Sequence, residues 1–219
     1  MIEAIVYINL AHRNDRKAAI LSELAKIHTV CANIYRIDAV LEPLCGHLGC
    51  GKSHVKALEL AIHHGWSSVL IVEDDIQFMA EPAVLTTMLT QVFDVPWDVV
   101  LLGLGHHVIR PSSHTYLKKV DFSSCAHGYI IRKEYYRTLA DNFMTAVNKM
   151  TKQLDDHIAK CKTISKLNNC SAIDQEWFSL QSKDTFYAFE PQLCIQNPSF
   201  YSDNNCSIAY QTSQITKST

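Results

Sequence analysis

The run Val69-Leu70-Ile71-Val72 leads directly into Glu73-Asp74-Asp75, and this junction decides how the rest of the chain is interpreted. A short, unbroken apolar run is typical of a strand that is buried on both faces, as in the parallel sheets of α/β proteins. Open α/β sheets bind their ligands in a crevice at the carboxyl ends of such strands. The sequence therefore predicts a strand over 68–72 and a binding site at the three acids that follow it.

Apolar runs and amphipathic helices alternate along the rest of the chain. Further strands are expected over 2–10, 30–39, 97–102 and 124–131, and helices are expected over 13–27, 53–64, 82–93 and from 133 onward. This alternation predicts an α/β fold with a mostly parallel central sheet flanked by helices. We interpret 1–219 as one domain, in which the polar segment 140–170 forms a helical insert or a lid and the last fifty residues are irregular cover.

The composition is that of an ordinary globular protein. Hydrophobic residues make up 47% of the 219 residues and charged residues 19%, which excludes a disordered or coiled-coil chain. The net charge of -2 provides no general attraction to nucleic acid. The N-terminus lacks the basic region of a signal peptide, and no apolar run is long enough to span a bilayer. We therefore expect a cytoplasmic protein with reduced cysteines and no integral membrane segment, and we leave peripheral membrane contact open.

Residues 46–53, Gly-His-Leu-Gly-Cys-Gly-Lys-Ser, match the phosphate-loop pattern G-x-x-x-x-G-K-[ST]. An ATP-dependent phosphotransferase is therefore one function to weigh. A phosphate loop follows a strand directly, so that backbone N–H groups converge on the phosphates, and Pro43 argues against a strand here. The competing interpretation is that the glycines shape a turn into a helix with Ser53 as its N-cap.

The three acids at the end of the apolar strand, Glu73-Asp74-Asp75, repel one another unless a cation or hydrogen-bond donors offset their charge. Carboxylate oxygens favour Mn2+ or Mg2+ as that cation. The alternative is a solvated loop whose acids cap the next helix. Asp174 and Glu176 form a second acidic site, for which a helix N-cap is the alternative. No His and Cys spacing matches a zinc site, so His54 and the pair His106-His107 are assigned to core or loop roles.

Taken in order, the fragments of the chain resemble glycosyltransferase family 25, the family of lipopolysaccharide-biosynthesis and procollagen galactosyltransferases. The fragments that carry the resemblance are Tyr7-Ile8-Asn9-Leu10 with Arg13 and Arg16, Gly46 and Gly49-Cys50 with Ser53-His54, Leu70 to Asp75, Trp97-Asp98, Leu101-Leu102-Gly103, Cys125 to Ile131, Asp174, and Gln196-Asn197-Pro198 with Ser202-Asp203. Each fragment is common, but the ordered set spans most of the chain. Lys52 falls at a variable position of this set, which accounts for the match to a phosphate loop.

The resemblance implies a GT-A-type nucleotide-sugar-binding fold and metal-dependent transfer of a hexose, galactose or glucose, from a UDP-sugar. Glu73 and Asp75 would hold the metal, most simply Mn2+, with Mg2+ as the alternative. The donor-binding residues that it implies are Asn9, Leu10, Arg13, Arg16, Ser53 and His54 at a helix start, Asp74, and Asp203 in place of the histidine that many GT-A enzymes carry near the C-terminus. The acceptor would be a glycan, a lipid-linked oligosaccharide or a hydroxylated side chain, with 140–170 on the acceptor side.

The transfers of this family are typically inverting, which requires a carboxylate to take the proton from the acceptor hydroxyl as that oxygen attacks. Asp174 is the candidate general base, with Glu176 as the alternative. Two other functions stay open: the phosphate-loop phosphotransferase, and a catalytically inactive module that binds a nucleotide sugar. ATP binding would indicate the phosphotransferase, and UDP binding without turnover would indicate the inactive module.

Overall fold

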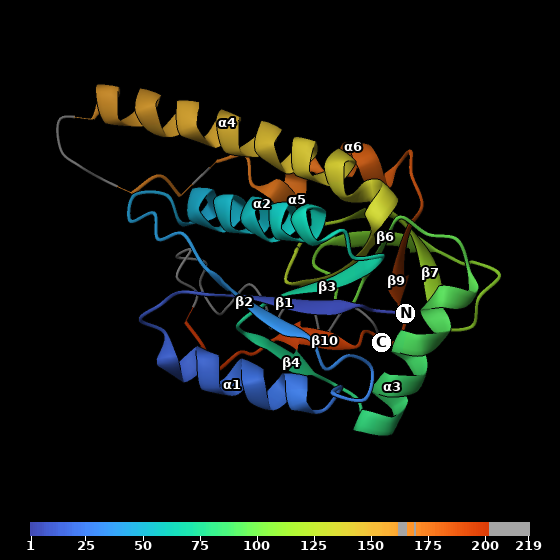
Figure 1. The fold of residues 1–219 in the computed structure, drawn as a ribbon. Helices are drawn as coiled ribbons and strands as arrows, with labels where there is room; N and C mark the ends of the chain where they lie inside the picture. Colours follow the sequence, from blue (N-terminus) through green and yellow to red (C-terminus); the bar gives the residue numbers. More distant parts are fainter. Residues whose placement is uncertain (162–165, 169, 202–219) are drawn as a thin grey trace.

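A central sheet runs through the molecule and carries helices on both of its faces (Figure 1). The computed structural model describes residues 1–161, 166–168 and 170–201. Within these residues the sheet has eight strands in the order β2-β1-β3-β8-β5-β9-β7-β6. Their bounds are β1 Ala4–Asn9, β2 Ile34–Asp38, β3 Ser68–Glu73, β5 Val99–Leu101, β6 His107–Arg110, β7 Leu117–Ser123, β8 Gly128–Arg132 and β9 Phe186–Phe189. A separate antiparallel pair joins β4 (Ile76–Phe78) to β10 (Cys194–Gln196).

Six of the eight strands of this sheet run in one direction, and β8 and β7 run against them. The neighbours β2–β1, β1–β3 and β5–β9 are parallel. The neighbours β3–β8, β8–β5, β9–β7 and β7–β6 are antiparallel, so each reversal is followed by a return to the common direction. The predicted α/β architecture with a mostly parallel central sheet is therefore confirmed.

Two apolar cores lie on the two faces of the sheet, because successive side chains of a strand point to opposite faces. In β1, Ala4, Val6 and Ile8 belong to one core, and Ile5 and Tyr7 belong to the other. The first core is covered by α2 (Gly46–His64) and α4 (Tyr136–Lys160), and the second by α1 (Asn14–Ala25) and α3 (Pro82–Gln91), as Figure 1 shows. Short helices complete the described chain: 3-10 turns Val92–Asp94 and Lys133–Tyr135, α5 Ile173–Glu176 and α6 Phe178–Gln181.

The helix α2 begins at Gly46, seven residues before the start expected from the sequence. The expectation of a glycine turn with Ser53 as N-cap is therefore wrong. Glycine is a poor helix former, so its presence argued for a turn, but close packing requires it here. A Cβ atom on Gly49 would lie 2.4 Å from the carbonyl oxygen of Val40, and one on Gly51 would lie 3.0 Å from the side chain of Ile173.

The C-terminal part of the chain contributes a strand to the sheet, which the sequence patterns did not predict. The strand β9 lies between β5 and β7, and Phe186, Ala188 and Phe189 are buried there. The expectation that the last fifty residues are only irregular cover is wrong for this segment, because its aromatic residues fill both cores of the sheet. The strands β6 and β7 were also missed.

The polar segment 140–170 was expected to form a helical insert or a lid. Residues 140–160 lie within α4, which packs along α2 (Figure 1), and the role of 140–170 as an insert or lid stays a prediction.

Among the helices of the described ranges, none combines the length and the hydropathy that a membrane span requires.

Candidate functional site

A cavity of about 330 Å³ lies at the carboxyl ends of three adjacent parallel strands, β2, β1 and β3. Its apolar wall is formed by Ile8, Leu10 and the segment 39–44 that follows β2. Its polar side is formed by Arg16, Cys50, Ser53, His54, Glu73, Asp74, Asp75, Lys166, Asn168 and Gln196. The cavity therefore lies at the strand ends where the sequence predicts a crevice, beside the three adjacent acids.

Arg16 is the cation that offsets the charge of Asp74 and Asp75. One guanidinium nitrogen of Arg16 lies 3.0 Å from Oδ1 of Asp74 and 3.3 Å from Oδ2 of Asp75, and all three side chains are at least nine-tenths buried. Asn9 donates a 2.7 Å hydrogen bond to the other carboxylate oxygen of Asp74. An arginine 58 residues before Asp74 in the chain therefore offsets part of the charge of these acids, and a divalent cation at Glu73 and Asp75 stays a prediction.

Asp75 is held by Arg16 and by a hydrogen bond with the side chain of Gln196, but one of its carboxylate oxygens is not satisfied. Burial raises its pKa most, the Glu73 charge raises it further, and Arg16 lowers it, which leaves a pKa of about 7. Burial also raises the pKa of Asp74, against the opposing effects of Asn9 and Arg16. Oδ1 of Asp75 is buried and has no hydrogen-bond partner among the described residues. A buried acceptor without a partner is costly, so a donor on a ligand in the cavity would stabilise this site.

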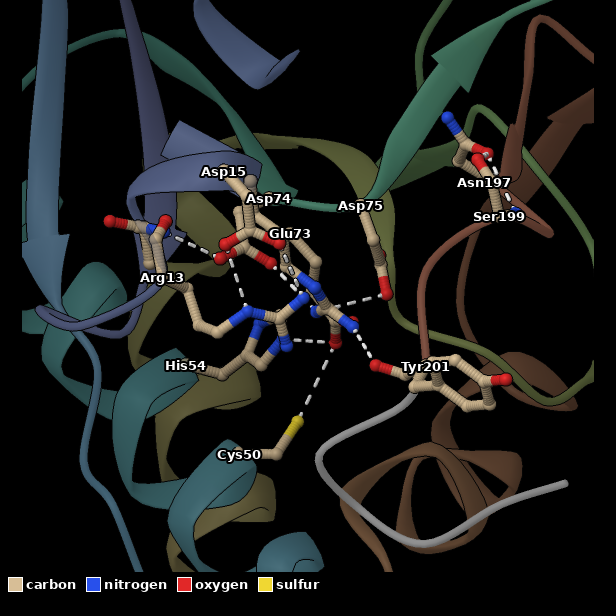
Figure 2. A network of polar contacts seen from close by, with 12 residues as sticks. Arg13, Asp15, Cys50, His54, Glu73, Asp74, Asp75, Asn197, Ser199 and Tyr201 are labelled. Atoms are coloured by element: carbon tan, nitrogen blue, oxygen red, sulfur yellow. Dashed lines mark hydrogen bonds and ion pairs between the residues drawn. The ribbon is translucent and has the colours of Figure 1, made fainter. Parts of the chain in front are cut away.

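Glu73 faces α2 and contacts Cys50 and His54 (Figure 2). Nε2 of His54 lies 3.3 Å from Oε1 of Glu73, and Sγ of Cys50 lies 3.5 Å from the same oxygen. Burial alone would raise the pKa of Glu73, but the hydrogen bond and charge of His54 hold it at about 2. His54 is fully buried against the rings of Tyr129 and Phe143, as expected of a core histidine, and its ring also contacts an acid at the cavity.

Only some of the implied donor-binding residues lie on the cavity. Leu10, Arg16, Ser53, His54 and Asp74 line it. Of the remaining three, Asn9 and Arg13 make other contacts. Asn9 holds Asp74 and accepts a hydrogen bond from Arg36, and Arg13 makes a two-pronged ion pair with Asp15 (Figure 2). Asp203 lies outside the described residues.

Ser53 lies inside α2 rather than at its start, which corrects the expectation taken from the family pattern. Its hydroxyl is buried, donates to the carbonyl of Gly49 and accepts from the backbone N–H of Val40 at 2.8 Å. Ser53 thus ties the segment 39–44 to the helix and positions the apolar wall of the cavity.

The second acidic site divides into two different environments. Oδ2 of Asp174 accepts a 2.9 Å hydrogen bond from the backbone N–H of Cys125, and burial raises the pKa of Asp174, with a further rise from the charge of Glu73. Glu176 is held in an ion pair at 2.7 Å by Lys149 on α4. Neither carboxylate lines the cavity. Asp174 lies within electrostatic reach of the acids at the cavity, whereas the charge of Glu176 is already paired.

The phosphate-loop interpretation is wrong, because residues 46–53 form the first two turns of α2. A phosphate loop presents several backbone N–H groups to one anion, whereas an α-helix uses them internally after its first turn. Lys52, the residue that would reach the phosphates, pairs with Glu42 at 3.2 Å. An ATP-dependent phosphotransferase of this class is therefore not supported.

We expect the substitution Lys52→Ala to cost no more than about 1 kcal/mol of stability, since both partners of its ion pair are partly exposed. It should also leave the affinity for any nucleotide within about threefold of the wild type, well short of a tenfold change of about 1.4 kcal/mol. Chemical denaturation and equilibrium nucleotide binding measure the two effects. Loss of ATP binding in this variant alone would restore the phosphotransferase interpretation.

Several residues that line the cavity were not predicted from the sequence. Cys50 carries a signal in its spacing, because residues four apart lie on one face of a helix and His54 follows it by four. That signal was hidden by placing the helix start at Ser53. No local signal marks the wall segment 39–44, Lys166 or Asn168, since only the fold brings them to the strand ends. Gln196 lies in one of the fragments of the family resemblance, but it was not selected as a site residue.

Comparison with known proteins finds similarity among solved structures alone. No protein-family model and no curated protein matches the chain. Solved structures with a similar arrangement include mannose-1-phosphate geranyltransferase from Thermus thermophilus, at 9% identity over 86% of this chain and 73% of that chain, with a TM-score of 0.49. Another is a glycosyltransferase involved in the glycosylation of the major capsid of PBCV-1, at 8% identity over 99% of this chain and 100% of that chain, with a TM-score of 0.46. Likeness at this level concerns the fold alone, and membership of glycosyltransferase family 25 stays a prediction.

Proposed function

We propose that this protein is a nucleotide-sugar-dependent glycosyltransferase that binds its donor in the cavity at the ends of β2, β1 and β3. One observation carries this proposal: the cavity combines an apolar wall with a floor of buried carboxylates at the carboxyl ends of parallel strands. Its volume of about 330 Å³ lies within the usual range for small-molecule sites. The apolar wall suits the flat base of a nucleotide, and the floor suits a polyhydroxylated group.

The acids of the floor favour a ligand rich in hydroxyl groups. Carboxylate oxygens accept hydrogen bonds, and each hydroxyl of a ribose or hexose donates one. Oδ1 of Asp75 is a buried acceptor that lacks a donor among the described residues. We assign it to a hydroxyl of the bound donor.

The reaction we propose is inverting transfer of a hexose, galactose or glucose, from a UDP-sugar. The acceptor hydroxyl gives its proton to a carboxylate as its oxygen attacks the anomeric carbon, and the bond to UDP breaks with both electrons going to the diphosphate. Asp174 is our candidate for the carboxylate, because burial raises its pKa while Glu176 is ion-paired. The acceptor class in this proposal is a glycan, a lipid-linked oligosaccharide or a hydroxylated side chain.

The oxygen-only Mn2+ site expected at Glu73 and Asp75 does not fit the side chains found there. Oδ2 of Asp75 faces the guanidinium of Arg16, and Glu73 turns to a histidine and a thiol. Mn2+ and Mg2+ prefer carboxylate, carbonyl and water oxygens. We therefore derive no step of the reaction through such an ion.

We expect UDP and a UDP-sugar, but not ATP, to stabilise the protein against heat. A ligand at 100 times its dissociation constant contributes about 2.7 kcal/mol, which raises the Tm of a chain of this length by about 5–10 °C. Thermal unfolding with each nucleotide measures this, and release of UDP from UDP-glucose or UDP-galactose measures turnover. A shift with UDP but no turnover with either sugar would favour the inactive binding module, and a shift with ATP alone would refute the proposal.

A further inference from the structure

Cys50, His54 and Glu73 bring a sulfur, a nitrogen and an oxygen together at the edge of the cavity (Figure 2). The three potential ligand atoms lie within 4.8 Å of one another. Cys50 and His54 lie on one face of α2, four residues apart, and Glu73 ends the neighbouring strand β3. All three side chains line the cavity.

The separations of the sulfur and of the nitrogen from the carboxylate oxygen match two edges of a tetrahedral zinc site. With Zn–S of about 2.3 Å, Zn–N of about 2.0–2.1 Å and Zn–O of about 2.0–2.2 Å, a tetrahedron places S and O about 3.5–3.7 Å apart and N and O about 3.3–3.5 Å apart. The contact from Cys50 to Glu73 is 3.5 Å and that from His54 to Glu73 is 3.3 Å. Charge-assisted hydrogen bonds between nitrogen and a carboxylate are usually shorter, about 2.7–2.9 Å.

A partner behind His54 completes the arrangement that histidine ligands require. Metal-binding histidines usually donate their second ring N–H to a neighbouring acceptor, which holds the ring in place. Nδ1 of His54 lies 3.0 Å from the hydroxyl of Tyr129, so Nε2 is the nitrogen that faces Glu73. A thiolate, a carboxylate and a neutral imidazole carry two negative charges together, and these balance a divalent ion in a largely buried place.

We propose that Cys50, His54 and Glu73 form a binding site for a borderline-soft divalent ion such as Zn2+, with its fourth coordination position open to the cavity. A thiolate and an imidazole select Zn2+ over Mn2+, which lies at the weak end of the divalent series. Three protein ligands and one open position are the pattern of zinc sites that bind a ligand directly. Cys50 and His54 also make hydrogen bonds to Glu73, which hold the three side chains together.

Cobalt provides the most direct test, because tetrahedral Co2+ with a thiolate ligand shows intense visible bands and a sulfur-to-metal charge-transfer band. Apo protein is titrated with Co2+ under reducing conditions. We expect the wild type to bind one equivalent and show both features, and Cys50→Ser to lose the charge-transfer band. Two matched controls, Cys161→Ser and Cys170→Ser, should keep it, although Cys161 lies 3.6 Å from His157 and Cys170 lies 3.6 Å from Cys45.

Zinc affinity tests the individual ligands. We expect His54→Gln and Glu73→Gln to weaken Zn2+ binding, measured by competition with a chromogenic chelator, by more than the about 10- to 100-fold typical of losing an outer-shell partner. Tyr129→Phe removes only the outer partner of His54 and keeps the ring, so a loss of about tenfold is expected with a native fold. Equal affinity in all these variants and the wild type would overturn the assignment.

The test of the zinc site is independent of the proposed function, because the cobalt and zinc measurements use no nucleotide and no sugar. Absence of a thiolate-to-cobalt band in the wild type would show that the three side chains are only hydrogen-bonded, and a band lost in Cys161→Ser or Cys170→Ser instead would place the ion elsewhere. UDP binding without zinc binding would refute this site alone, and zinc binding without UDP binding would refute the proposed function alone.

Discussion

Replacing Arg16 with methionine is expected to lower the free energy of unfolding by about 3–5 kcal/mol, the cost of removing one partner from a buried ion pair. The side chains of Arg16, Asp74 and Asp75 are 7%, 8% and 8% exposed, so water cannot take over the charge compensation. Methionine retains much of the aliphatic volume but leaves two carboxylates without their cation. Arg16 also donates to the carbonyl of Tyr201 and stacks on the ring of Phe200, and both contacts are lost.

The matched control for this prediction is Arg110→Met. Arg110 pairs with Asp121 at 2.8 Å, but the two side chains are 60% and 42% exposed, so the cost should stay below about 1 kcal/mol. Urea denaturation of both variants gives the comparison. A double variant provides a further test. Adding Asp75→Asn to Arg16→Met removes one of the uncompensated charges and should recover part of the lost free energy of unfolding. Equal losses for Arg16→Met and Arg110→Met would refute the role of Arg16 as the buried counter-ion.

Replacing Asp174 with asparagine is expected to lower kcat by about 10²- to 10⁴-fold, because asparagine cannot accept the proton of the acceptor hydroxyl. Its amide keeps the size of the carboxylate, and its oxygen can still accept the hydrogen bond from the backbone N–H of Cys125. The fold and the affinity for UDP should therefore change little. Initial rates with a UDP-sugar, together with UDP binding and thermal unfolding of the same samples, separate a chemical defect from a structural one.

Two further variants test whether the effect on kcat is specific to Asp174. Asp121→Asn makes the same chemical change on the surface, where Asp121 pairs with Arg110, and should leave kcat unaltered. Glu176→Gln tests the alternative general base. A large fall in kcat for Glu176→Gln combined with full activity of Asp174→Asn would transfer the role to Glu176, and full activity of both variants would remove the second acidic site from the mechanism.

Much of the fold is readable from the sequence because it depends on local patterns. The apolar run 68–72 and the acids after it predict a buried strand with polar residues at its end, and β3 and the cavity lie there. The helices α1 and α3 follow from apolar residues at helical spacing. The start of α2 is not readable in this way, since glycine disfavours helices and only the close approach of Gly49 to Val40 explains it.

The same distinction applies to the candidate site. Arg16, His54 and the three acids could be selected from the sequence, but which of them pair with one another could not. Asp74 and Asp75 meet Arg16 from α1, and Glu73 meets Cys50 and His54 from α2. These pairs are separated by 19 to 59 residues, and no local pattern encodes them.

The sequence by itself determined the alternation of strands and helices and the position of the acids at a strand end, because hydrophobic periodicity is a local property of the chain. The tertiary structure alone decided which side chains each acid contacts. Parallel strands align their carboxyl ends at one edge of the sheet, so the loops and helices after β1, β2 and β3 deliver their side chains to a single cavity. Arg16 is therefore the counter-ion of Asp74 and Asp75. Cys50 and His54 both contact Glu73.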